Sequence, residues 1–347
     1  MASNTKSIIP ALTGLRAVAA WMIFGLHFFP MKNPAVPEFL KKIVSQWHIG
    51  VDIFFVLSGF LITYRYFGKK INLKQYFVNR FSRIYPMYFL ITIGVFLHFY
   101  ITSGYWNSEK TIEALLSFTM TKALFLKYFM AGIPQGWTLT LEELFYFTAP
   151  LYFILIARRK IWLYLLPVII FLFGTVLKNS VAVPENVWGF MQDNISIYIF
   201  EFFAGIILAT AFQNGRLPKF RFPVYTTVGA LFLIFFPLVF TVSFGTTDLR
   251  MAAERIVLAF IGVAPLIYGL ITEKTLLSRL FSTKPMILLG KSSYVFYLIH
   301  KGFIAILIYE YIAPNVATVF IVLNILSIIL FKYIEEPLNH WIRRNYA

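Results

Sequence analysis

Residues 313–334 read APNVATVFIVLNILSIILFKYI, and the first charged side chain in this stretch is Lys332. An α-helix rises about 1.5 Å per residue, so about 20 mostly apolar residues are needed to cross the hydrocarbon core of a bilayer. This stretch is long enough and carries almost no charge. It therefore predicts a membrane-spanning helix.

Stretches of this kind recur along the whole chain, and about ten are long and apolar enough to span a bilayer. They lie near residues 11–29, 47–67, 84–102, 138–157, 160–177, 194–212, 222–243, 251–271, 290–310 and 313–334. Hydrophobic residues make up 59% of the 347 residues and charged residues 13%, against roughly half and a quarter in a soluble domain. The sequence thus predicts an all-α, polytopic integral membrane protein of about ten transmembrane helices, with residues 1–347 forming a single domain.

The chain is strongly basic, with 31 Lys and Arg against 15 Asp and Glu and a formal net charge of +16. In a soluble protein this balance would suggest nucleic-acid binding. Here the larger basic clusters fall in alternate connections between apolar stretches, which is typical of cytoplasmic loops in a membrane protein. Lys6 and Arg344 lie on the same predicted side as these clusters, so we expect both termini in the cytoplasm. The expected partners include membrane lipids and exclude nucleic acid.

The sequence contains no cysteine. This excludes disulfides, thiolate metal sites and a cysteine acyl-enzyme. We expect no metal site and no tightly bound cofactor. Residues 1–7 contain one basic residue and no convincing cleavage site, so we interpret them as leading into a retained first span.

Ionisable side chains inside the predicted spans mark candidate functional positions, because a charge in the bilayer interior costs from about 2.5 to more than 10 kcal/mol. Arg16 and His27 lie eleven positions apart in the first span. At 100° per residue this is about 1100°, or three turns plus roughly 20°, so the two residues share one helix face about 16 Å apart. With the N-terminus inside, Arg16 would lie toward the cytoplasm and His27 toward the outer leaflet.

This arrangement suits a long anionic donor whose phosphates lie near Arg16 and whose reactive end lies near His27. In the alternative interpretation, Arg16 snorkels to the membrane interface and His27 is a hydrogen-bonded structural residue. Geometry alone leaves both interpretations open.

Acyl transfer to a hydroxyl requires a base that removes the proton and a carboxylate that orients this base. Asp52, Glu142 and Glu143 lie at the start of inward-running spans, in the same predicted half of the membrane as His27. His27 with either Asp52 or Glu142 would meet both requirements. Glu142 and Glu143 lie about 100° apart on a helix, so they cannot face the bundle in the same way.

Other polar positions have competing interpretations. Glu254 and Arg255 are more simply explained as structural pairing. The role of His300 stays open between function and structure. Ser58 with Gly59 predicts close helix packing, because small residues let two backbones approach.

Two segments outside the spans also have two interpretations each. The basic and aromatic segment Ile71–Pro86 is better explained as a helix at the lipid headgroups than as an anion site. The connection from about 103 to 137 is the longest, and it either covers a site or merely joins two spans.

Several blocks of the sequence resemble the membrane-bound acyltransferase family 3, which includes bacterial polysaccharide O-acetyltransferases. They are Arg16-Ala-Val-Ala-Ala-Trp-Met-Ile-Phe-Gly-Leu-His27 with the spacing Arg-x10-His, Gly50-Val-Asp-Ile-Phe-Phe-Val-Leu-Ser-Gly-Phe-Leu-Ile62, Arg80-Phe-Ser-Arg-Ile-Tyr-Pro86, Trp137-Thr-Leu-Thr-Leu-Glu-Glu-Leu-Phe-Tyr146, Ser292-Ser-Tyr-Val-Phe-Tyr-Leu-Ile-His300 and Glu336-Pro337. These blocks follow the family order over essentially the whole chain. Thr138 stands where the family often has Ser, and Ala17 where it often has Gly.

The resemblance implies acyl-CoA as donor substrate and transfer to a carbohydrate or related hydroxyl. It implies that Arg16 and His27 are essential and that Glu142 is the matched glutamate of its block. Arg80 and Arg83 join Arg16 as candidates for binding the donor phosphates. The implied location is the bacterial plasma membrane, with multiple spans.

The leading hypothesis is an O-acetyltransferase that modifies a cell-surface polysaccharide, its lipid-linked precursor or another sugar. A transporter for a glycan or lipid-linked sugar is the main alternative, because buried charges also line transport pathways. No inverted repeat or broken helix pair is evident in the sequence, which counts against transport. A third hypothesis keeps acyl transfer and makes the acceptor a small hydroxylated metabolite.

Overall fold

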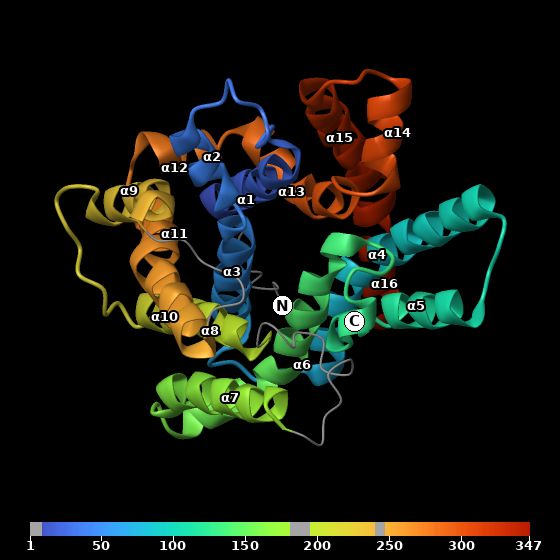
Figure 1. The fold of residues 1–347 in the computed structure, drawn as a ribbon. Coiled ribbons are helices and arrows are strands. Elements are labelled where there is room, and N and C mark those ends of the chain that lie inside the picture. Colours follow the sequence, from blue (N-terminus) through green and yellow to red (C-terminus); the bar gives the residue numbers. More distant parts are fainter. Residues whose placement is uncertain (1–8, 181–194, 240–246) are drawn as a thin grey trace. The chain divides into compact units, whose positions relative to one another are not determined.

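The computed structural model describes residues 9–180, 195–239 and 247–347 (Figure 1). Over these ranges the chain forms α-, 3-10 and π-helices and no β-strand. Within these described ranges, seven helical segments are long and apolar enough to cross a membrane, or eight if one bent pair counts as a span. The predicted all-α, polytopic membrane fold is therefore confirmed, whereas the number of ten spans stays a prediction.

The α-helices have the following bounds: α1 Pro10–Phe28, α2 Glu38–Ser45, α3 Ile49–Tyr66, α4 Leu73–Ser103, α5 Ser108–Phe118, α6 Trp137–Arg158, α7 Trp162–Lys178, α8 Ile199–Gln213, α9 Val224–Val239, α10 Asp248–Val257, α11 Ala264–Thr272, α12 Leu276–Phe281, α13 Lys284–Ile299, α14 Phe303–Tyr311, α15 Val316–Leu330 and α16 Glu336–Tyr346. The 3-10 helices are η1 Lys122–Leu124, η2 Leu126–Tyr128, η3 Pro134–Gly136 and η4 Ile195–Tyr198. Two π-helices, η5 Leu258–Val263 and η6 Phe331–Glu335, join α10 to α11 and α15 to α16.

The chain divides into two compact units, which we describe separately. Unit 1 comprises Met1–Lys69, Phe153–Val168 and Ile197–Lys291, and unit 2 comprises Lys70–Tyr152, Ile169–Ser196 and Ser292–Ala347. The helices α6, α7 and α13 contribute residues to both units. That residues 1–347 form a single functional domain stays a prediction.

The core of unit 1 is built around α1, α3 and α8, with α11 and η5 packed beside them. At the crossing of α3 and α8, a Cβ added to Gly59 would lie 2.0 Å from Phe202 O, and one added to Gly205 would lie 2.1 Å from Val56 O. Real Cβ atoms do not approach backbone oxygens this closely, so each helix presents a glycine to the other. This confirms the close packing predicted at Gly59.

In unit 2, the helix α4 is 31 residues long and contains Pro86 in its interior. The basic segment predicted over Ile71–Pro86 and the span predicted over 84–102 are therefore parts of one helix. An interior proline lacks an amide hydrogen and costs about 3 kcal/mol in a helix. The helix continues through Pro86, and side chains on both sides of it, including Tyr76 and Tyr88, are buried.

The span predicted over residues 290–310 is not one straight helix. Here α13 and α14 are bent by 91° across a short break, and Gly302 in this break has a φ of +116°. Only glycine adopts this backbone conformation readily. The structure thus has a broken helix pair where none is evident in the sequence, because the apolar residues on both sides conceal the break.

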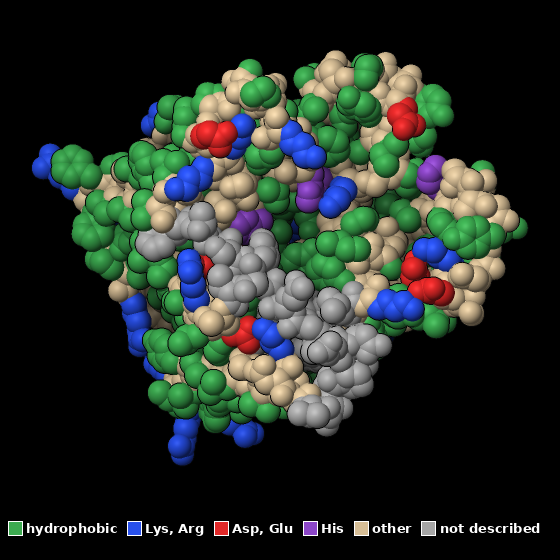
Figure 2. Space-filling model, in the orientation of Figure 1, with side chains coloured by type: hydrophobic (Ala, Val, Ile, Leu, Met, Phe, Trp, Pro, Cys, Tyr) green, Lys and Arg blue, Asp and Glu red, His purple; other side chains and the backbone are tan. Residues whose placement is uncertain are grey.

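Large hydrophobic side chains remain on the surface of the described residues. Phe147 and Val176 are 72% and 67% exposed, and many other aromatic and aliphatic residues are similarly open. Figure 2 shows hydrophobic side chains over much of the face in view. Exposed apolar surface on this scale is typical of a protein that contacts lipid.

Candidate functional site

The two residues singled out in the first span lie on one uninterrupted helix. Pro10 begins α1 at a position where its missing amide hydrogen costs nothing, and the helix continues without a break through Arg16 to His27. The side chain of Arg16 is half-buried, and that of His27 is exposed. Eleven helical positions therefore separate them by about 16 Å along the axis.

The segment between α2 and α3 packs against α1 just before His27. A Cβ added to Gly25 would lie 2.2 Å from the indole ring of Trp47, so that ring rests directly on the α1 backbone. A groove with a volume of about 760 Å³ lies beside the next residue, Leu26. The groove is lined by Leu26, Met31, Glu38, Phe39, Lys41, Lys42, Ser45 and Leu238. An amphipathic groove thus adjoins the end of α1 that carries His27.

Asp52 belongs to a buried ion-pair cluster in unit 1. Arg255 Nη1 donates hydrogen bonds to Asp52 Oδ1 and, at 2.8 Å, to Glu201 Oε1. The same guanidinium lies 4.1 Å from the centre of the Tyr198 ring, and its Nη2 donates to the Tyr198 hydroxyl at 3.2 Å. The three charged residues are at most 3% exposed. The cluster joins α3, α8 and α10.

This cluster confirms the structural pairing predicted for Arg255 and shows what surrounds Asp52. Asp52 Oδ1 is bonded to Arg255, while Asp52 Oδ2 has no hydrogen-bond donor among the described residues. Glu201 Oε2 is in the same situation. The assignment of Asp52 as the carboxylate that orients His27 stays a prediction, and only Oδ2 would remain for that contact.

The matched glutamate, Glu142, lies in unit 2 near the start of α6. Its Oε1 accepts a hydrogen bond from the hydroxyl of Tyr146, one turn later on the same helix face. The guanidinium of Arg80 on α4 lies 5.0 Å from the centre of the Tyr146 ring. The hydroxyl of Tyr76, also on α4, donates to Tyr146 O at 2.6 Å. Glu142 and Arg80, predicted from different blocks, therefore meet at Tyr146.

A third arginine approaches the basic turn of α4 from α16. Arg343 Nε donates to Ser82 Oγ at 3.2 Å, and its Nη2 donates to Asn79 O at 3.3 Å. Arg83 is half-buried on the same turn. Nothing in the sequence singles out Arg343 as a site residue, because 261 positions separate it from Ser82 and only the fold brings them together.

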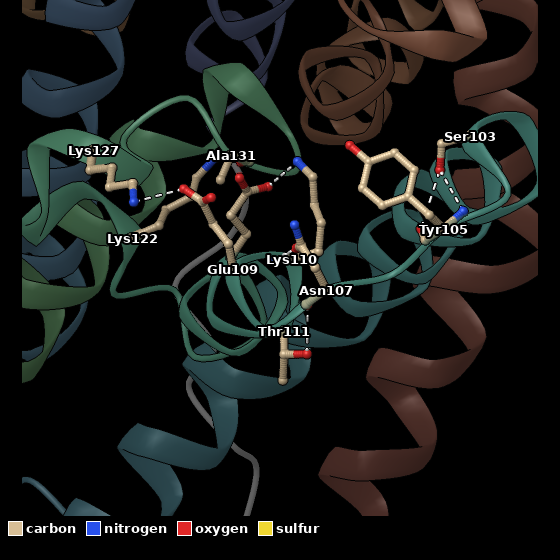
Figure 3. A network of polar contacts seen from close by, with 10 residues as sticks. Ser103, Tyr105, Asn107, Glu109, Lys110, Thr111, Lys122, Lys127 and Ala131 are labelled. Atoms are coloured by element: carbon tan, nitrogen blue, oxygen red, sulfur yellow. Dashed lines mark hydrogen bonds and ion pairs between the residues drawn. The ribbon is translucent and has the colours of Figure 1, made fainter.

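The long connection between α4 and α6 contains a set of polar contacts drawn in Figure 3. Asn107 caps α5 by accepting from Lys110 N at 2.8 Å, and Lys127 pairs with Glu109 at 2.7 Å. Lys122 behaves differently, since it is fully buried and its Nζ donates to Ala131 O at 2.5 Å and to Ile133 O. Burial lowers the pKa of Lys122 to about 7. Whether this connection covers a site stays open.

Each unit therefore supplies its own set of candidate groups. Unit 1 contains Arg16 and His27 on α1, and also Asp52 bonded to Arg255. Unit 2 contains Glu142, Arg80 and Arg83. A base and carboxylates are groups that acyl transfer can use, and guanidinium groups form paired hydrogen bonds with phosphate or carboxylate oxygens. Within the described ranges, no cluster of three or more His, Asp or Glu could hold a metal ion.

Comparison with known proteins gives a consistent result over nearly the whole chain. A profile of the acyltransferase domain family matches residues 9–334. The peptidoglycan O-acetyltransferase OatA of Listeria monocytogenes is 25% identical over 96% of this chain and 56% of its own length. The protein YrhL of Bacillus subtilis, whose name gives peptidoglycan O-acetylation as a provisional activity, is 28% identical over 95% of this chain and 55% of its own. The chain thus spans about half the length of these relatives, and no solved structure matches it.

Proposed function

Since the chain belongs to the acyltransferase family whose profile matches residues 9–334, we propose that it is a membrane O-acetyltransferase acting on a glycan of the cell envelope. The donor is acetyl-CoA. The acceptor is a hydroxyl of a cell-surface polysaccharide or of its lipid-linked precursor. The names of two relatives support peptidoglycan as the first acceptor to test.

His27 acts as the general base in this proposal. It takes the proton of the acceptor hydroxyl while the hydroxyl oxygen forms a bond to the acetyl carbon. The thioester carbon–sulfur bond breaks, its electron pair leaves with the CoA sulfur, and the proton held by His27 passes to this sulfur to give the thiol. The observation that carries the proposal is that Arg16 and His27 share one unbroken helix and that the imidazole of His27 is exposed at its end.

Two carboxylates remain candidates for orienting His27. Asp52 could do so only through Oδ2, since Oδ1 is bonded to Arg255. Glu142 accepts a hydrogen bond from Tyr146 through Oε1. Both are proposed positioning residues, and their charge-neutral variants Asp52→Asn and Glu142→Gln distinguish them by which one lowers kcat.

Arginine side chains bind the donor phosphates. Arg80 and Arg83 are one helical turn apart on α4, and Arg343 approaches the same turn. Guanidinium groups form paired hydrogen bonds with phosphate oxygens, which makes this turn suitable for the anionic part of CoA. Arg16 is the corresponding candidate on α1. With basic residues predicted on the cytoplasmic side, we place both termini and the donor in the cytoplasm and the chain in the plasma membrane.

One observation favours the transport alternative. A helix pair bent by 91° within a predicted span resembles the discontinuous helices that line substrate sites in transporters. In that case the chain would move a glycan without consuming acetyl-CoA. The experiment below separates the two functions.

The test uses purified, detergent-solubilised protein with acetyl-labelled acetyl-CoA and soluble peptidoglycan fragments. Wild type is compared with His27→Ala and with His340→Ala, a matched control because His340 is also exposed and lies on α16. We expect labelled fragments with wild type and His340→Ala, and a loss of at least about 100-fold with His27→Ala, as for removal of a general base.

Three results would contradict parts of the proposal. Full transfer by a folded His27→Ala protein would remove His27 as the base. Binding of the glycan fragments without any consumption of acetyl-CoA by the wild type would favour transport. Transfer to a small soluble alcohol but to no glycan would move the acceptor to the small-metabolite class.

A further inference from the structure

The groove beside the end of α1 lies wholly within unit 1, as does His27. It adjoins α1 at Leu26, the residue before His27. The helix α2 contributes most of the lining, and the last turn of α9 contributes Leu238. This arrangement follows from the packing of α2 against both α1 and α9. One unit therefore holds the proposed base and a groove next to it.

Lys42 is the cation of this groove that pairs with no carboxylate among the described residues. The neighbouring Lys41 pairs with Glu38 at 2.6 Å. Lys42 Nζ instead donates to Leu238 O at 2.7 Å, a carbonyl in the last turn of α9, where no following helical turn supplies an amide. This contact holds the ammonium at the groove and uses one of its three hydrogens. Its charge and two hydrogens remain for an anionic group.

The rest of the lining provides apolar walls. The side chains of Leu26, Met31, Phe39 and Leu238 line the groove together with the polar ones. Phe39 is 58% exposed, and Val239, which follows Leu238, is 74% exposed. Exposed apolar side chains thus continue from the lining onto the surface, which is typical of a surface that contacts lipid. An apolar chain lying in the groove would cover these walls and remove them from water.

These features match an amphiphile that carries a phosphate between an apolar chain and a sugar. The phosphate oxygens would accept charge-assisted hydrogen bonds from Lys42. A soluble glycan has no apolar chain and would leave Leu26 and Phe39 uncovered. An uncharged lipid would leave the ammonium without an anion. The sugar of a lipid-linked glycan is next to its phosphate, so it would lie near the end of α1.

We propose that this groove binds the acceptor and that the acceptor is a lipid-linked glycan, not the finished polysaccharide. The inference rests on the proposed function. The phosphate of the lipid carrier binds Lys42, its apolar chain lies on Leu26 and Phe39, and the attached sugar reaches His27. Binding of the carrier thereby brings a sugar hydroxyl to the base, which lowers the entropic cost of the reaction.

The first measurement is equilibrium binding of radiolabelled farnesyl phosphate to the protein in a neutral detergent. Farnesol, which has the same chain and no phosphate, is the comparison ligand. We expect Lys42→Gln to weaken binding of farnesyl phosphate by about 10- to 100-fold, as for loss of a charge-assisted hydrogen bond, and to leave binding of farnesol unchanged. Lys42→Arg keeps the charge and should retain most of the affinity.

The matched control is Lys32→Gln. Lys32 is exposed in the same connection between α1 and α2, and it does not line the groove. This variant changes the net charge by the same amount, so it measures the general attraction of the protein for an anion. We expect its affinity for farnesyl phosphate to stay within about threefold of wild type, because Lys32 makes no contact with the bound phosphate.

A second pair of variants tests the apolar part of the groove. Phe39→Asn should weaken binding of both farnesyl phosphate and farnesol, because the chain loses an apolar wall. Leu40→Asn is its control, since Leu40 is the next residue of α2, is 37% exposed and does not line the groove. Elution volume and melting temperature are measured for every variant, and only folded proteins are compared.

Steady-state acetyl transfer then relates the groove to the reaction. The two acceptors are a peptidoglycan disaccharide linked through phosphate to farnesol and the same disaccharide without the lipid. We expect wild type to have the lower KM for the lipid-linked form. Lys42→Gln should raise this KM by about 10- to 100-fold and leave KM for acetyl-CoA and for the soluble disaccharide unchanged.

The proposal is overturned if folded Lys42→Gln binds farnesyl phosphate as wild type does, or if Lys32→Gln loses as much affinity. Unchanged binding with a lowered melting temperature would make Lys42 only a cap of α9. Equal displacement of farnesyl phosphate by phosphatidylglycerol would make an ordinary membrane lipid the occupant. Failure of the proposed function is a different result, in which wild type acetylates neither acceptor, whereas the binding measurements need no acetyl transfer.

Discussion

Glu201 on α8 accepts a hydrogen bond at 2.8 Å from Arg255 on α10, a residue 54 positions later in the chain. The same nitrogen of Arg255 also donates to Asp52 on α3. Two buried carboxylates of unit 1 therefore share one guanidinium. Removal of one member of such a cluster leaves an uncompensated buried charge, which is more costly than loss of the attraction itself.

We expect Arg255→Met to lower the free energy of unfolding by about 3–5 kcal/mol, because Asp52 and Glu201 would face each other without a cation. Denaturation in detergent measures this. The control is Lys127→Met, which removes an ion pair with Glu109 in which the two side chains are 54% and 48% exposed, and it should lower the free energy of unfolding by less than about 1 kcal/mol. If the two variants lowered the free energy of unfolding equally, the buried cluster would not stabilise unit 1.

Gly59→Ala should destabilise the protein, because its Cβ would lie 2.0 Å from Phe202 O and force α3 and α8 apart. Overpacking of this kind costs about 1–3 kcal/mol or more. In α4, Gly94→Ala is the control, since its Cβ would meet the Phe303 ring at an ordinary 3.5 Å. Alanine there should be neutral or slightly stabilising. Thermal melting compares the two, and a Gly59→Ala protein as stable as wild type would contradict the packing described.

The lowered pKa of buried Lys122 predicts that the stability of the protein depends on pH. Its pKa is lowered from 10.5 to about 7 by burial, so between these values the unfolded chain binds more protons than the folded one. Burial of the protonated amine lowers the free energy of unfolding by its full amount below about pH 7. Above about pH 10.5 the amine is neutral in both states, and this destabilisation is absent. The melting temperature of the wild type should therefore rise with pH across this range.

The variant Lys122→Met should remove this rise, because methionine does not titrate. The control is Lys127→Met in the same connection, where the lysine is 54% exposed and pairs with Glu109. That variant should keep the wild-type slope. Parallel curves for wild type and Lys122→Met would show that Lys122 is not buried as an amine of lowered pKa.

Arg83→Gln should raise KM for acetyl-CoA by about 10- to 100-fold with a smaller change in kcat, because a charge-assisted hydrogen bond to a phosphate contributes about 1.5–3 kcal/mol. Steady-state kinetics of acetyl transfer measures both constants. Arg344→Gln is the control, an exposed arginine next to Arg343 on α16. An unchanged KM in Arg83→Gln would remove this arginine from the donor site.

Apolar periodicity in the sequence correctly predicted the all-α membrane fold and most of the helix positions. It also placed Arg16 and His27 on one helix, because the angular spacing of residues within a helix depends only on local geometry. It did not predict the break at Gly302. A single glycine between two apolar segments hardly changes the mean hydropathy of the stretch. The side chain of Gln135, which donates to the carbonyls of Tyr297 and Leu298 at the break, comes from 162 or more positions away.

The partners of the buried charges were likewise invisible in the sequence. Asp52 is a typical candidate to orient a nearby histidine, and only the packing of α3 and α10 against α8 shows that its Oδ1 is bonded to Arg255. What the sequence by itself determined is which residues are helical and apolar, since these are local properties of a chain in lipid. What only the tertiary structure decided is which polar groups meet, since a buried charge or carbonyl takes whichever partner the packed helices bring within about 3 Å.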